Sequence, residues 1–81
     1  MKMNTKLYNE LIAWAEKAEE GDNATVDGRK AEVTNMAGGK FLLSELYDPY
    51  TWVDPLETIA GQTDSVEAVA IYLITGKVYN F

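Results

Sequence analysis

The apolar residues of segment 5–20 recur every three or four positions, which is the pattern of an amphipathic helix. They are Leu7, Tyr8, Leu11, Ile12, Trp14, Ala15 and Ala18. Asn4 or Thr5 can cap the first turn, and Gly21 can end the helix on its C-terminal side. The sequence therefore predicts a helix over residues 5–20.

The next segment, 21–47, changes to the alternating pattern of β-strands. Short apolar or β-branched runs at 24–26, 29–36 and 40–47 are separated by two turn signals, which are Asp27-Gly28 and Gly38-Gly39. These runs predict a three-stranded antiparallel meander.

Two further helices are predicted after the sheet. Asp54 can cap a short helix, with Pro55 in its first position and Glu57 reaching back, and Gly61 ends it. A last helix begins at Asp64, which Glu67 follows three positions later, and it ends at Gly76. Its buried stripe consists of Val66, Val69, Ala70, Leu73 and Ile74.

The predicted fold is a single α+β domain over residues 1–81. An N-terminal helix, a three-stranded antiparallel sheet, a short helix and a C-terminal helix follow in that order, and the helices pack on the sheet. The apolar tail 77–81 is expected to pack back on the sheet as an extra edge strand. The short length leaves no room for a second domain.

The amino-acid composition argues against most kinds of catalytic site. The chain has no cysteine and no histidine, so thiolate metal sites and the commonest general base are both missing. Ser44 and Ser65 therefore lack a usual base, and the pairs Asp54/Glu57 and Asp64/Glu67 are interpreted as helix caps. We expect no enzyme activity, no cofactor and no metal.

Hydropathy favours a cytoplasmic location. The longest uninterrupted apolar run, Ala68–Ile74, is far shorter than the roughly 18–20 residues that a membrane-spanning helix needs. Helical periodicity begins directly at Leu7, which argues against a signal peptide. No membrane partner is therefore expected.

The net charge of −6 is unevenly distributed along the chain. Residues 41–76 contain six acidic residues and no basic one, and the acids are Glu45, Asp48, Asp54, Glu57, Asp64 and Glu67. Nucleic-acid binding needs cations that neutralise phosphates, so direct contact with nucleic acid is disfavoured.

Segment 45–57 is the candidate protein-binding site. It interleaves acidic and aromatic residues without a cation, and the candidates are Glu45, Tyr47, Asp48, Tyr50, Trp52, Asp54 and Glu57. Tyr and Trp are enriched at the energetic centres of protein interfaces. The alternative is that Tyr47 and Trp52 fill the gap between sheet and helices.

This pattern predicts a non-enzymatic acidic module that binds a basic protein. In one version it is an inhibitor whose carboxylates mimic nucleic-acid phosphates towards a nucleic-acid-binding partner. That profile is similar to the small acidic anti-restriction and anti-CRISPR proteins of phages and mobile elements, although no motif matches a particular family. Two alternatives remain: the charge only keeps the domain soluble, or the protein is an assembly subunit that forms a homodimer through an edge strand or the tail.

Overall fold

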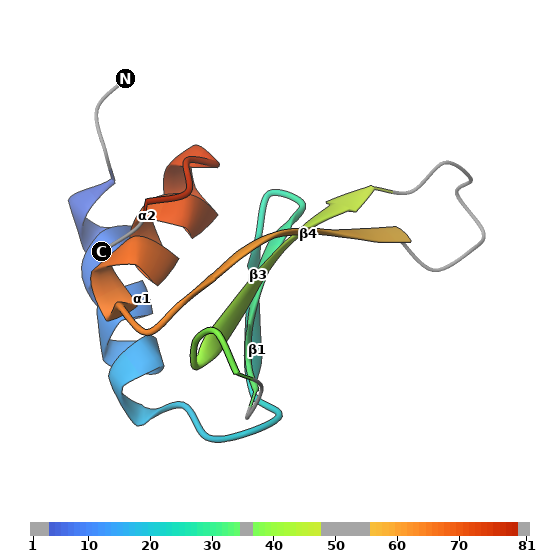
Figure 1. Cartoon of the computed structure of the whole chain (residues 1–81). Helices are drawn as coiled ribbons and strands as arrows, with labels where there is room; N and C mark the ends of the chain where they lie inside the picture. The colour runs from blue at the N-terminus through green and yellow to red at the C-terminus, as the bar shows by residue number, and fades with distance from the viewer. Residues whose placement is uncertain (1–3, 35–36, 48–55, 80–81) are drawn as a thin grey trace.

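The described residues, 4–34, 37–47 and 56–79, form two helices on one face of a four-stranded antiparallel sheet in the computed structural model (Figure 1). The elements are α1 (Thr5–Lys17), β1 (Asn23–Val26), β2 (Arg29–Val33), β3 (Phe41–Tyr47), β4 (Leu56–Thr63) and α2 (Val66–Thr75). The α+β class, the first and last helices and the antiparallel sheet are confirmed. Within the described residues, however, the sheet has four strands rather than three, and there are two helices rather than three.

Helix α1 begins where the sequence predicts but ends earlier, at Lys17. The Asn4 side-chain oxygen accepts a hydrogen bond from a backbone N–H in the first turn at 3.1 Å. Beyond the helix, the Asp22 carboxylate accepts from the backbone N–H of Glu19 at 2.9 Å and closes a turn. Acidic residues are unfavourable at a helix C-terminus because of the macrodipole. The turn therefore places Glu19 and Glu20 better than a further helical turn would.

The hairpin between β1 and β2 has the predicted two-residue turn. Asp27 and Gly28 both have positive φ angles, 47° and 79°. Positive φ angles at both central residues are typical of the two-residue hairpin turn whose twist matches that of the flanking strands. Asp-Gly is one of the preferred sequences of this turn. The turn sets the register in which Val26 pairs with Arg29.

Residues 56–63 form strand β4, so the predicted short helix starting at Asp54 is wrong over these residues. The strand pairs antiparallel with the whole of β3. A helix of about two turns is marginal on its own, whereas Thr58 and Ile59 are β-branched and favour a strand. Pairing with β4 satisfies the backbone N–H and C=O groups of β3 that a helix at residues 56–63 would have left unpaired at the edge of the sheet.

Helix α2 is capped by Ser65, so the prediction of Asp64 as its cap is wrong. The Ser65 hydroxyl accepts a hydrogen bond from a backbone N–H of the first turn at 3.2 Å. The Asp64 carboxylate instead accepts from the backbone N–H of Lys40 at 2.8 Å, which ties the turn before β3 to the end of β4. Glu67 lies in the first turn, where the macrodipole favours an acid. Gly76 ends the helix with a φ of 80°, as predicted.

Arg29 connects β2 to the C-terminal end of α2. Its guanidinium donates to the carbonyl oxygens of Leu73 and Ile74 at 3.0 and 2.9 Å. The last turn of α2 has no basic residue of its own, and its terminal carbonyls have no partner within the helix. Arg29 supplies both the hydrogen bonds and the positive charge that this helix end favours.

Residues 77–79, which follow α2, do not form the predicted edge strand, and residues 80–81 lie outside the described residues. A Cβ built on Gly61 would lie 3.1 Å from a methyl group of Val78. Gly61 therefore admits the close approach of Val78 to β4, and it does not end a helix as predicted.

The core lies between the helices and the adjacent face of the sheet. Its largest fully buried apolar side chains are Phe41, Leu43, Val69 and Leu73. The Trp14 ring lies against Phe41, with 6.3 Å between the ring centroids. The core covers Phe41 and Leu43 of β3, whereas Glu45 and Tyr47 near the end of this strand are exposed.

Candidate protein-binding surface

The structure places three of the candidate residues on one β-hairpin. Glu45 and Tyr47 lie on β3, and Glu57 lies on β4. The other four candidates lie outside the described residues, and they are Asp48, Tyr50, Trp52 and Asp54.

The end of this hairpin extends beyond β2 and away from the helices (Figure 1). The pairing of β2 with β3 ends at Arg29 and Glu45, but β3 and β4 continue to pair as far as Tyr47 and Leu56. All five β4 residues in the range 56–60 are exposed. We call residues 45–47 and 56–60 the distal hairpin. A two-stranded ribbon without a covering layer is only marginally stable in water.

The distal hairpin carries large apolar side chains that face solvent. Tyr47, Leu56 and Ile59 are 52%, 49% and 62% exposed. Among the described residues, the other large exposed apolar side chains are Val78 and Tyr79, in the segment after α2. Isolated surface apolar residues are normal, but a group of them on one element indicates an interaction surface.

The two faces of the distal hairpin differ in character. Residues that are directly opposite in an antiparallel pair share a face. Tyr47 therefore lies beside Leu56 on one face, the side of the sheet that bears the helices. Two positions of β4, Glu57 and Ile59, lie on the other face, which is the open face of the sheet.

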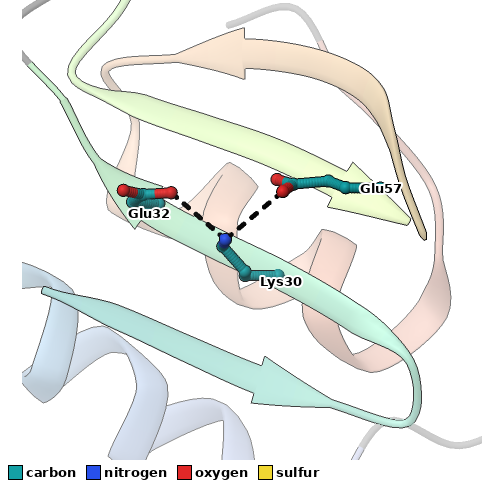
Figure 2. Close-up of polar contacts among 3 residues, drawn as sticks. All are labelled: Lys30, Glu32 and Glu57. Atoms are coloured by element: carbon teal, nitrogen blue, oxygen red, sulfur yellow. Dashed lines mark hydrogen bonds and ion pairs between the residues drawn. The ribbon is translucent and has the colours of Figure 1, made fainter. Parts of the chain in front are cut away.

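A charged cluster spans β2 and β4 on the open face (Figure 2). The Lys30 ammonium lies 3.2 Å from the Glu32 carboxylate and 3.5 Å from that of Glu57. Ser44 of the intervening strand pairs with Lys30, and its small side chain leaves room for the lysine to reach over β3. Two carboxylates share one ammonium, so the cluster has a net charge of −1.

The environment of the cluster favours the ionised forms of Glu57 and Lys30. The Ser44 hydroxyl and the Lys30 ammonium hold the pKa of Glu57 below its ordinary value. The Ser44 oxygen is buried without a partner at full hydrogen-bond geometry, so it acts on Glu57 as a nearby dipole rather than through a well-formed hydrogen bond. Partial burial acts to lower the pKa of Lys30, but the bond to Glu32 and the charges of both carboxylates outweigh it and raise the pKa.

Replacing Lys30 with methionine is expected to lower the free energy of unfolding by about 0.5 kcal/mol near neutral pH. The loss is small because both ion pairs of Lys30 are partly exposed to solvent. The stabilisation by the ion pairs depends on pH at both ends. Because the pKa of Glu57 is lowered, the stabilisation is lost as the pH falls through the pKa of Glu57 in the folded protein. Because the pKa of Lys30 is raised, it is also lost as the pH rises through the pKa of Lys30 in the folded protein. The difference from wild type should therefore be largest between about pH 5 and pH 10.

Urea unfolding at pH 3 and pH 7 measures this difference. Lys77→Met, which removes the same charge from the segment after α2, is the matched control and should show a smaller difference at pH 7. A Lys30→Met difference that is equally large at pH 3 and pH 7 would contradict the assignment of the cluster.

The cluster does not have the features of a serine–lysine catalytic pair. A nucleophilic serine must reach a substrate, but Ser44 has no exposed area. A lysine that acts as a general base needs a lowered pKa, whereas that of Lys30 is raised. The described residues contain no pocket and no group of three or more His, Cys, Asp or Glu arranged to hold a metal ion.

Sequence reasoning missed three residues of this surface. Leu56 and Ile59 were interpreted as part of a helix, although the β-branched residues around Ile59 are a strand signal. Lys30 was not connected with Glu57, because the two are 27 positions apart and only the sheet register brings them together.

No helix of the described residues is long and apolar enough to cross a membrane.

Comparison with known proteins identifies no relative of this chain. No protein-family model, no curated protein and no solved structure matches this chain.

Proposed function

We propose that this protein is a non-enzymatic acidic binding module of the cytoplasm whose distal hairpin contacts a basic surface of a partner protein. The observation that carries the proposal is the combination of side chains at one end of the molecule. Exposed Tyr47, Leu56 and Ile59 lie on the same hairpin as Glu45 and Glu57. This end of the sheet also has no covering layer among the described residues.

The two kinds of side chain have different roles in this proposal. Tyr47 and Ile59 supply apolar area, which contributes most of the affinity at the centre of an interface. The acids supply attraction and specificity, because opposite potentials accelerate encounter and disfavour wrong partners. Residues 41–76 contain no lysine or arginine, so nothing within this stretch of sequence offsets the negative potential.

The partner class that fits best is a nucleic-acid-binding protein. Such proteins carry clustered cations that neutralise phosphates, and the carboxylates of the hairpin would compete for those cations. The protein would then act as an inhibitor, in the manner of the acidic anti-restriction and anti-CRISPR proteins of phages and mobile elements.

Affinity capture with matched variants tests this proposal. The Glu45→Lys/Glu57→Lys variant reverses the two acidic charges of the distal hairpin. The Glu16→Lys/Glu20→Lys control makes the same change in net charge at the end of α1 and just beyond it. Wild type and control should retain the same basic protein, whereas the hairpin variant should retain at least about tenfold less, since a close charge pair contributes more than about 1.4 kcal/mol. Raising the salt concentration should release the partner.

Circular dichroism of both variants verifies that they are folded before capture is compared. If the hairpin variant and the control retain equal amounts of the partner, the hairpin is not the contact surface and the proposal is wrong.

A further inference from the structure

We propose that the outer edge of β4 binds an extended cationic segment of the partner as an additional strand of the sheet. This inference rests on the proposed function and specifies the way in which the distal hairpin recognises its partner. Strand addition of this kind gains affinity from backbone hydrogen bonds and specificity from alternate side chains.

The first support is the open edge itself. The strand order is β1-β2-β3-β4, so the outer edge of β4 has no neighbouring strand among the described residues. A strand edge presents unpaired backbone donors and acceptors that can pair with another chain. The pairing with β3 is regular from Ile59 to Leu56, because the bulge in this pairing lies further along, next to Gly61.

The second support is the lack of features that usually protect an edge. Proteins guard exposed edges with lysine, proline or a very short strand. The opposite edge strand, β1, has only four residues. In contrast, β4 has eight residues, contains neither lysine nor proline, and carries a single charge, at Glu57.

The side chains of β4 indicate what the added strand must contain. Glu57 and Ile59 project from the open face, and Leu56 and Thr58 project from the other face. The charged cluster around Lys30 has a net charge of −1, so it can accept one more cation beside Glu57. A segment in which cationic and aliphatic residues alternate presents its cations to Glu57 on the open face and its apolar side chains to Leu56 on the other face.

Charge disfavours a second copy of this chain as the occupant. Pairing two copies along β4 would bring together two hairpins whose surrounding sequence, residues 41–76, carries acids and no cation. Each chain also has a net charge of −6. A cationic segment replaces this repulsion with attraction.

Peptide titration of the isotope-labelled full chain, followed by nuclear magnetic resonance, tests strand addition. The probe is an end-blocked eight-residue peptide of alternating lysine and valine, and it should shift the amide signals of residues 56–60. Two further peptides carry N-methyl groups on alternate residues, in the two possible registers. One of them should bind at least about tenfold more weakly, because N-methylation removes the donors that face β4. A peptide with glutamate in place of lysine should not bind.

Three results overturn the inference. The first is no binding of the lysine–valine peptide up to about 1 mM, the limit of a weak complex. The second is equal binding of both N-methylated peptides, and the third is concentration-dependent shifts of residues 56–60 without peptide, which would show that a second copy occupies the edge.

The two proposals can fail separately. If strand addition fails but the Glu45→Lys/Glu57→Lys variant still loses the captured partner, the hairpin binds through side chains alone. If that variant retains the partner, the proposed function fails whatever the peptides do.

Discussion

Replacing Phe41 with alanine is expected to lower the free energy of unfolding by about 3–5 kcal/mol. Phe41 has no exposed area, and its ring packs beside Trp14 between the sheet and α1. Truncation removes the favourable free energy of transferring the ring from water to the core, and it leaves a cavity. The backbone of residue 41 is held by its pairing with Val33 and Thr63 on the neighbouring strands, so the surrounding structure cannot fully close this cavity. A domain of this size has few kcal/mol to lose, so the variant should unfold at a much lower urea concentration.

Ile59→Ala is the matched control for this core substitution. Ile59 lies in the same hairpin but is 62% exposed, so its truncation should change the free energy of unfolding by no more than about 0.5 kcal/mol. Comparable losses in the two variants would mean that the distal hairpin is covered in solution, contrary to the arrangement described above.

Replacing Gly39 with alanine is expected to destabilise the protein by about 2–3 kcal/mol. Gly39 has a φ of +149°, where side chains are rarely tolerated, and a Cβ there would lie 2.7 Å from the backbone nitrogen of Thr63. Because this nitrogen belongs to the backbone of β4, it cannot move aside as a flexible side chain would. The substitution should loosen the turn before β3 and shift the thermal unfolding midpoint downward.

Gly21→Ala separates the two causes of this loss, which are backbone strain and the steric clash with β4. Gly21 also has a left-handed φ, +94°, but a Cβ built on it meets no atom within 4 Å. Its replacement therefore introduces backbone strain alone and should cost about 1 kcal/mol. Equal effects of the two substitutions would refute the close approach of the Gly39 turn to β4.

Hydrophobic periodicity predicted the elements that carry their own signals. The stripe that includes Leu11 identified α1, and the Asp27-Gly28 turn identified the first hairpin. Strand β4 was mistaken for a helix because Asp54, Pro55 and Glu57 together form a convincing local helix start. Local signals of that kind are overridden when pairing along a whole neighbouring strand is available.

The candidate surface was only partly accessible to sequence reasoning. Acidic and aromatic residues made segment 45–57 the candidate, and the structure places its residues Glu45 and Tyr47 on β3 and Glu57 on β4, with Tyr47 52% exposed. Ile59 and Lys30 were missed for a different reason. Whether Ile59 is covered, and which acid lies near Lys30, depends on the order and register of the strands, which no local pattern specifies.

The packing of α1 against α2 has a consequence for how the chain folds. The entire sheet lies between these helices in the sequence, yet Leu11 and Leu73 belong to one core. Contacts between segments so distant in sequence form late, because the intervening chain must first lose much of its conformational freedom. A nascent chain that emerges from the ribosome without α2 therefore lacks the helix that packs against every strand of the sheet, and folding waits until α2 has been made.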